Sequence, residues 1–246
     1  MEMSSSSLKI IFQKVEKTIS AALYAQFYRI ITCLLFLISR LLFQVRISGQ
    51  EKPILWRRQH KLPFLVAAPH RSWLDAGFLP VAFGSSPESR LKYFAKDELK
   101  IIFQFIPFSS RFMIYIDRDN PGVSAIKKVI LSVKEGNNLA IFPEGTTIPQ
   151  NKKTYGGIIE IIKKVKESTN KEIPIFPLNI KTSGFPYGKP QGKWYYNLTG
   201  RVKVELKIGD PIFYRDLEKA VGNKELTKSQ KRTIMVEELL RQIDQI

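Results

Sequence analysis

The sequence predicts an α/β fold, a sheet with helices on its faces, and three observations lead to this prediction. Apolar runs of strand length alternate along the chain with longer segments whose apolar residues recur at helical spacing. Proline and glycine stand at the ends of several segments, where strands and helices commonly begin and end. The chain has 246 residues and a hydrophobic fraction of 44%, which suits one well-packed domain with some chain to spare.

The first 50 residues are predicted to form a membrane-associated helical segment that precedes a domain at 51–246. From Ile19 to Val45 only Arg29 and Arg40 are charged, and no stretch reaches the roughly 18 uncharged apolar residues of a spanning helix. Basic flanks and interleaved aromatic residues are typical of a helix, or a bent pair of helices, in the interface of an anionic leaflet. A helix buried against the domain and a tilted span with snorkelling arginines are the alternatives.

The elements of the domain follow from their apolar patterns. Continuous apolar runs bounded by turn residues indicate buried strands, and the segment 201–209 alternates apolar and charged residues like a half-exposed strand. The segment 121–136 starts with proline and ends with glycine, as helices often do. The predicted strands are 63–69, 92–96, 111–117, 137–145, 173–180 and 201–209, and the predicted helices are 72–83, 121–136, 155–167 and 226–246.

Three polar clusters follow predicted strands. They are "PHRSWLD" at 69–75, "DRDN" at 117–120 and "PEGTT" at 143–147. In an open α/β sheet, ligands bind in the crevice beyond the carboxyl ends of the strands. We therefore expect the three clusters to converge on one site.

His70 and Asp75 are the candidate acid–base pair of the first cluster. Five positions on a regular helix correspond to a rotation of about 140° away from a shared face. The two side chains meet if His70 lies in the loop and Asp75 lies in the first helical turn. Asp75 then fixes the imidazole tautomer and leaves the other nitrogen as a base for a substrate hydroxyl. A purely structural alternative is that Ser72 caps the helix and Asp75 favours its positive end, and both interpretations are compatible.

Composition excludes several other classes of protein. The formal charge of +17 implies an anionic partner, but the lysines are scattered and no nucleic-acid-binding motif is present. Two histidines, His60 and His70, are too few for a metal site. Ser72 is not part of the G-x-S-x-G motif that surrounds the nucleophile of many serine hydrolases. The single cysteine, Cys33, excludes an internal disulfide and is predicted to be a buried structural thiol. A basic membrane-surface binding protein without activity remains an alternative, although it leaves the polar clusters without a role.

Four motifs in order resemble those of the glycerolipid acyltransferases. "HRSWLD" (70–75) matches the HxxxxD motif, "YIDR" (115–118) resembles the second block, "FPEGT" (142–146) matches the third and "IPIFPLNI" (173–180) resembles the fourth. The segments at 152–157 and 204–212 also lie where similar segments occur. HxxxxD alone is common by chance, whereas four blocks in the same order, over roughly positions 60 to 215, are highly specific.

The resemblance implies a mixed sheet flanked by helices and an O-acyltransferase of phospholipid biosynthesis that needs neither cofactor nor metal. The donor would be acyl-CoA or acyl-carrier protein, and the acceptor 1-acylglycerol-3-phosphate, so that the product is phosphatidic acid. His70 would be the general base and Asp75 its orienting partner. The enzyme would act on the cytoplasmic face of the membrane, where acyl thioesters are made.

The resemblance also implies the residues that bind the acceptor. Arg118 would hold the acceptor phosphate, because a guanidinium is always charged and its fork matches phosphate oxygens. Glu144, Gly145 and Thr146 would shape the acceptor pocket, with Gly145 allowing close approach of the backbone. Without the other motifs, an ion pair of Arg118 with Asp117 or Asp119 would be the simpler interpretation.

Three positions depart from the family pattern. Pro69 stands where asparagine is frequent, Phe112 where the second block usually has glycine, and Thr147 where the third block commonly continues with arginine. The arginine helps to bind phosphate in matching enzymes, and Lys152 and Lys153 are candidates to replace it. The alternative is a lysophospholipid acceptor with another head group.

Overall fold

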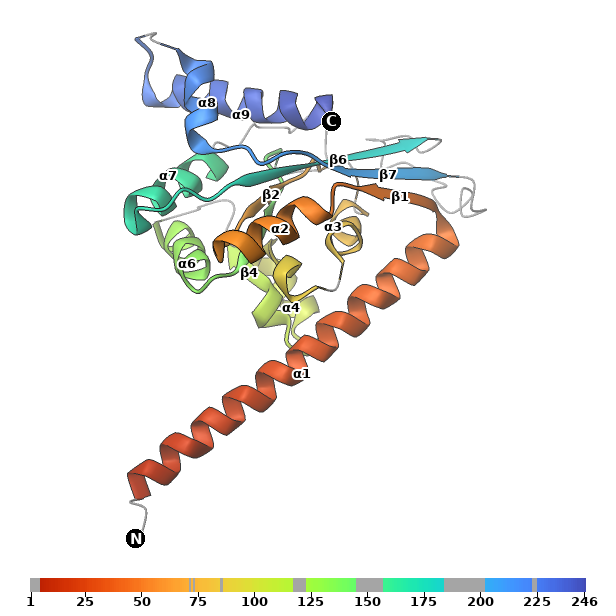
Figure 1. The fold of residues 1–246 in the computed structure, drawn as a ribbon, viewed down its shortest axis with the longest axis vertical. Coiled ribbons are helices and arrows are strands. Elements are labelled where there is room, and N and C mark those ends of the chain that lie inside the picture. The colour runs from red at the N-terminus through yellow and green to blue at the C-terminus, as the bar shows by residue number, and fades with distance from the viewer. Residues whose placement is uncertain are drawn as a thin grey trace.

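The computed structural model describes residues 5–70, 72, 74–84, 86–116, 123–144, 157–183, 202–222 and 225–246. In this part of the chain, the strands form one mixed sheet with the order β1-β7-β6-β2-β5-β3-β4 (Figure 1). β6 and β7 are antiparallel, and every other neighbouring pair is parallel. The strands are β1 (Gln44–Ser48), β2 (Leu65–Ala67), β3 (Leu91–Lys96), β4 (Met113–Ile116), β5 (Asn138–Ile141), β6 (Ile175–Ser183) and β7 (Lys203–Ile208). The predicted mixed sheet flanked by helices is confirmed.

The helices flank this sheet, and the N-terminal helix projects beyond it (Figure 1). They are α1 (Ser5–Leu42), α2 (Glu51–His60), α3 (Asp75–Phe83), α4 (Lys100–Phe103), α5 (Ser109–Phe112), α6 (Val123–Lys134), α7 (Gly157–Thr169), α8 (Tyr214–Val221) and α9 (Lys228–Gln245), with 3-10 turns at Pro87–Ser89 and Asp97–Leu99.

Alternating side chains of the strands build two hydrophobic cores, one on each face of the sheet. In β2, Leu65 and Ala67 belong to the core that α6, α7, α8 and α9 cover. Val66 points the other way, into the core that includes α3 and the inner side chains of β7. A strand buried on both faces reads as a continuous apolar run, which is why "FLVAA" carries no alternation.

Two sequence expectations need correction, and some elements were not predicted. The predicted strand at 111–117 is shorter, because its first residues belong to the helical turn α5 and the strand begins at Met113. Cys33 is exposed, not buried, because it lies on a side of α1 that faces away from the domain. The elements that the sequence patterns did not reveal are β1, α2, α4, α5 and α8.

The N-terminal segment is one continuous helix, not a bent pair. α1 runs from beside the sheet to well beyond the body of the molecule (Figure 1). By length and composition, its residues Gln13–Leu42 suffice to cross a membrane. β1 follows α1 after one residue and pairs with β7, so the first strand of the sheet begins at Gln44.

Candidate functional site

The site lies where the carboxyl ends of β2 and β5 meet. These strands are parallel neighbours, with Ala67 beside Ile141, so the chain leaving each strand emerges at the same edge of the sheet. β2 continues through α3 on one face, whereas β5 precedes α7 on the other. In an open α/β sheet, ligands usually bind at the carboxyl edge where the connections of neighbouring strands leave toward opposite faces.

A hydrogen bond joins the first and third polar clusters at this edge of the sheet. The backbone N–H of His70 donates to Oε2 of Glu144 at 2.9 Å. His70 follows β2 and Glu144 follows β5, so the contact spans 74 positions of sequence. The first and third clusters therefore do converge, as the sequence analysis expected.

Asp75 lies behind the His70 imidazole. Nδ1 of His70 is 3.8 Å from Oδ2 of Asp75, and the two side chains are 17% and 0% exposed. His70 lies in the loop and Asp75 is the first residue of α3, which is the arrangement that allows them to meet. The 3.8 Å separation is longer than a hydrogen bond, and such pairs commonly tighten when substrate binds.

The loop between the two residues positions the Asp75 carboxylate. The backbone N–H of Ser72 donates to Oδ2 of Asp75 at 2.6 Å, and the N–H of Asp75 donates to the Ser72 carbonyl at 3.2 Å. Ser72 Oγ accepts from the N–H of Leu74 at 3.1 Å, so the serine also supports the entry to the helix. The carboxylate belongs to the first turn of α3, at the positive end of the helix dipole.

Phe142 packs against the ring of His70. The two rings are stacked, with centroids 4.3 Å apart and an angle of 21° between their planes. Phe142 follows β5 directly, so the same turn that supplies Glu144 also supplies this aromatic surface. One side of His70 thus faces Asp75, one face lies on Phe142, and its backbone is bonded to Glu144.

This geometry leaves Nε2 of His70 as the nitrogen available to a substrate. A base of this kind removes a proton from a hydroxyl, and the buried carboxylate stabilises the imidazolium that results. Among the described residues, no group of three or more histidine, cysteine, aspartate and glutamate side chains is arranged to hold a metal ion.

The remaining predicted site residues lie outside the described residues. These are Arg118, Gly145 and Thr146, together with Thr147. β4, which precedes Arg118, ends at the same edge of the sheet but is separated from β5 by β3. Phe142 is a site residue that the sequence analysis did not single out, although it stands inside the "FPEGT" motif that drew attention to Glu144.

Comparison with known proteins finds similar sequences over most of the chain. The sequence profile of the family described as "Acyltransferase" matches residues 44–181. A 1-acyl-sn-glycerol-3-phosphate acyltransferase of Bacillus subtilis (strain 168) is 28% identical over 187 residues, which cover 74% of this chain and 84% of that protein. An enzyme with the same name from Streptococcus pneumoniae is 29% identical over 160 residues, 63% of this chain and 52% of the relative.

A solved structure shares the fold. The crystal structure of the 1-acyl-sn-glycerophosphate (LPA) acyltransferase PlsC from Thermotoga maritima superposes with a TM-score of 0.56 and 20% sequence identity. The superposition covers 89% of this chain and 78% of that one, so the similarity includes the helices around the sheet as well as the sheet itself.

Proposed function

This chain belongs to the acyltransferase family, and from that premise we propose that it makes phosphatidic acid by acylating 1-acylglycerol-3-phosphate. The donor is a fatty acyl thioester, either acyl-CoA or acyl-carrier protein. The observation that carries the proposal is the His70 ring, which lies between the buried Asp75 carboxylate and the Phe142 ring at the carboxyl edge of β2 and β5.

In the proposed mechanism, Nε2 of His70 takes the proton of the acceptor hydroxyl. The oxygen attacks the thioester carbonyl, a carbon–oxygen bond forms, and the carbonyl oxygen becomes a tetrahedral oxyanion. Collapse of this intermediate breaks the carbon–sulfur bond, and the imidazolium returns its proton to the departing thiolate. Asp75 stabilises the imidazolium meanwhile, so neither cofactor nor metal is required.

The acceptor assignment rests on the names of both relatives and on the motif residues. In this proposal Arg118 holds the phosphate of the acceptor, while Gly145 and Thr146 shape its pocket. Glu144 has a second role in this proposal, because its carboxylate already accepts a hydrogen bond from the backbone N–H of His70. The carboxylate thus fixes the histidine loop as well as bordering the acceptor.

We further propose that α1, within residues 1–50, attaches the catalytic domain, whose sheet already includes β1, to the cytoplasmic face of an anionic membrane. α1 supports this, because it is long and apolar and most of its large hydrophobic side chains are exposed. The formal charge of +17 favours an anionic surface, and the lipid acceptor resides there.

A panel of substrates tests the proposal. Purified full-length protein is given lysolipids with different head groups, each with acyl-CoA and with acyl-carrier protein, and kcat/KM is ranked. We expect 1-acylglycerol-3-phosphate to rank first. A larger-headed lysophospholipid in first place would refute this acceptor, and absence of transfer to every acceptor would refute the reaction.

The variant Thr147→Arg gives the panel a second reading. With 1-acylglycerol-3-phosphate as acceptor, the added cation should leave kcat/KM unchanged or raise it, since it restores the arginine that commonly follows this motif. If the natural acceptor has a larger head group, the long side chain crowds it and the variant loses activity.

A further inference from the structure

The exposed side of α1 is apolar along most of its length. Seven of its exposed large hydrophobic side chains recur at intervals of three, four or seven residues, which places them in one stripe on the helix surface. Ile31, Phe36 and Ile38 are also exposed and lie outside this stripe. The opposite side, which includes the buried residues Tyr28, Thr32 and Ser39, packs on the domain. The stripe consists of Val15, Ile19, Leu23, Ile30, Leu34, Leu37 and Leu41.

The chain between β3 and β4 is fastened to this helix. The ring of Phe108 lies 6.1 Å from that of Tyr24 and 5.6 Å from that of Phe27, measured between centroids. Arg111 donates from Nη2 to Ser20 Oγ at 2.6 Å and from Nη1 to the Ser20 carbonyl at 3.1 Å. Phe108 holds a left-handed backbone with a φ of 60°, which is uncommon for a bulky residue and needs support from its surroundings.

The chain between β3 and β4 lies at the border of the apolar stripe of α1. Phe27 is four positions from Leu23 and three from Ile30, so it lies on the same side of α1 as those stripe residues. Phe108, which packs on Phe27, therefore carries the connection to that side.

Two large apolar side chains of the connection are left in the open. Ile101 is 68% exposed and Phe105 is 80% exposed. Both precede Phe108 closely in sequence. A phenylalanine this exposed is costly in water unless another surface covers it.

A cavity lined by lysines lies beside these residues. Its volume is about 300 Å³, and its lining includes Lys92, Lys100 and Lys128, with Asp97 and Glu135 as the carboxylates. Lys92 Nζ forms an ion pair with Glu135 at 3.9 Å, and Lys128 Nζ donates to the Tyr115 carbonyl at 3.4 Å. The three lysines of the lining outnumber its two carboxylates, so the cavity carries a net positive charge. Burial lowers the pKa of the Lys92 ammonium, so a bound anion would relieve a real cost.

We propose that the connection between β3 and β4 is a second membrane contact, in which Ile101 and Phe105 enter the leaflet beside α1 and the lysine-lined cavity takes the phosphate of an anionic phospholipid. The inference rests on the proposed membrane location of α1 and extends it. Two attachments along different directions prevent the domain from rotating about α1, so the carboxyl edge of β2 and β5 keeps one orientation to the bilayer. A lipid surface is favoured over a protein partner because the exposed side chains continue the stripe of a helix that is itself long and apolar enough for a membrane.

Depth measurements test the insertion, and the single cysteine makes them practical. An environment-sensitive fluorophore on native Cys33 reports α1. In a Cys33→Ser background, the same label at Phe105→Cys reports the connection, and at Leu55→Cys, an exposed apolar position on α2, it serves as the matched control. Each labelled full-length protein is mixed with vesicles of phosphatidylcholine and phosphatidylglycerol whose acyl chains carry a quencher.

We expect quenching at position 105 to match that at Cys33 within about twofold, while position 55 stays unquenched, because apolar side chains partition into the leaflet and exposed ones elsewhere do not. A label at position 105 that behaves like position 55, while Cys33 is quenched, overturns the second contact. In that case α1 still binds and acyl transfer to detergent-dispersed acceptor still proceeds, so the failure is separate from that of the proposed function.

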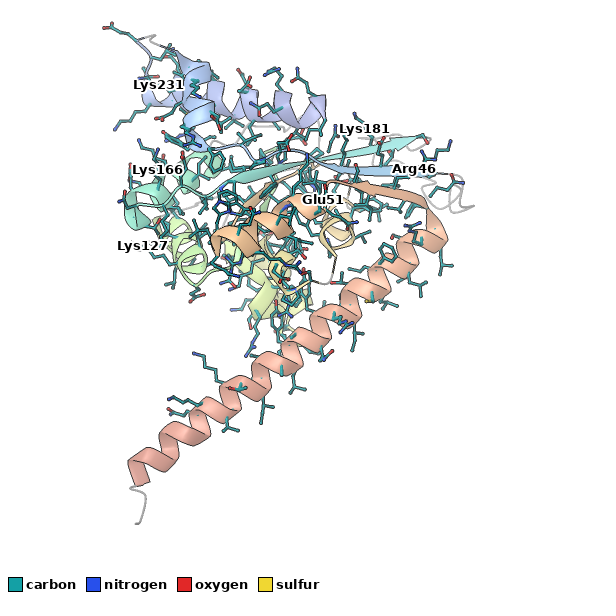
Figure 2. The ribbon with its side chains drawn as sticks, in the orientation of Figure 1. Arg46, Glu51, Lys127, Lys166, Lys181 and Lys231 are labelled. Carbon is teal, nitrogen blue, oxygen red and sulfur yellow. The ribbon has the colours of Figure 1, made fainter. Side chains whose placement is uncertain are left out.

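The headgroup site has its own variant and control. Lys100→Gln with Lys128→Gln should weaken binding to anionic vesicles by about fivefold for each lysine, with little change on neutral vesicles. The control, Lys219→Gln with Lys231→Gln, removes the same charge from α8 and α9, and Figure 2 shows Lys231 at the end of the molecule away from α1. Equal losses in both pairs would mean that only total charge matters and would overturn the site. If millimolar inorganic phosphate protects the cavity equally well with and without vesicles, and the lysine variants bind anionic vesicles normally, the cavity would be assigned to a soluble anion and the headgroup site would be overturned.

Discussion

At the scale of single residues, His70 is surrounded by three neighbours from the segments that follow two different strands, β2 and β5. Asp75 faces one ring nitrogen, Phe142 covers a ring face, and Glu144 accepts the backbone N–H. An unsupported imidazole would rotate and exchange tautomers, and fewer of its orientations would present Nε2 to a hydroxyl. The turn after β5 therefore contributes to the position of the proposed base as directly as the HxxxxD loop does.

The Phe142 contact leads to a first prediction. Phe142→Leu should lower kcat by about tenfold, because the loss of ring stacking lets the base leave its productive orientation. Phe142→Tyr keeps the ring and should retain most of the activity. KM for both substrates should stay within about twofold of the original, since Phe142 is proposed to position His70 and not to bind substrate.

Magnetic resonance checks the same prediction directly. The chain has two histidines, so a His60→Gln background leaves His70 as the only imidazole. We expect Phe142→Leu to remove the ring-current shift of the His70 protons and to broaden the tautomer signals. Unchanged imidazole signals in the leucine variant, or a change confined to KM of the acceptor, would contradict the positioning role.

Sequence alone predicted the His70 and Asp75 placement but not Phe142. The five-residue spacing requires a loop followed by a helical turn, and that requirement follows from helix geometry. The stacking on Phe142 depends on which strands become neighbours. A phenylalanine at the end of an apolar run looks the same whether it fills the core or supports a base.

At the scale of elements, the turn between β1 and α2 fixes the edge of the sheet. Gly49 has a φ of 79°, and a Cβ at this position would overlap the carbonyl oxygen of Ile208 on β7. The turn therefore brings the backbone of β1 closer to the end of β7 than any residue with a side chain permits.

This close approach gives a second prediction. Gly49→Ala should destabilise the fold by about 2–4 kcal/mol, because it adds both a steric overlap with backbone and an unfavourable φ. Gly77→Ala is the matched control, since nothing lies within 4 Å of its added methyl group and Gly77 lies in α3. Thermal unfolding should show a lower Tm for the first variant and an equal or slightly higher Tm for the second. A normal Tm for Gly49→Ala would mean that β1 does not pair with β7 as described.

The elements that sequence patterns missed have separate physical explanations. β1 follows α1 after a single residue, Phe43, so its alternation merges with the apolar run of the helix. α2 carries a proline and several charges, and it begins without a capping side chain. The start of the predicted strand at 111–117 is helical because Arg111 and Phe112 belong to the turn that docks on α1.

At the scale of the whole molecule, α1 has two sides with different tasks. Its inner side packs against α3 and β1, and its outer stripe is proposed to contact lipid. Composition predicted a membrane-associated helix, but only the tertiary structure tells which side chains remain for lipid. The exposure of Cys33 illustrates this, because an apolar run by itself suggested burial.

Serine substitutions on the two sides of α1 should have different effects: those on the outer stripe should weaken membrane binding, and those on the inner side should lower Tm. Ile30→Ser with Leu37→Ser should leave Tm nearly unchanged and weaken binding to anionic vesicles by tenfold or more, since each buried aliphatic side chain contributes about 1.5–3 kcal/mol. Tyr28→Ser with Leu35→Ser should instead lower Tm, because Tyr28 is buried and its oxygen accepts the N–H of Leu91 at 3.3 Å. Vesicle cosedimentation and thermal unfolding separate these effects, and a stripe variant that binds as well as the original protein would argue against lipid contact.

The most direct test of the central claim is the rate of acyl transfer by variants of the proposed base. Purified full-length protein, His70→Ala and Asp75→Asn are assayed for phosphatidic acid formed from 1-acylglycerol-3-phosphate and an acyl thioester, with circular dichroism as the check that each variant is folded. Loss of the general base should lower kcat by about 10²- to 10⁴-fold, and Asp75→Asn should also be severely impaired because an amide cannot stabilise an imidazolium. A folded His70→Ala protein that turns over at nearly the original rate would contradict the mechanism.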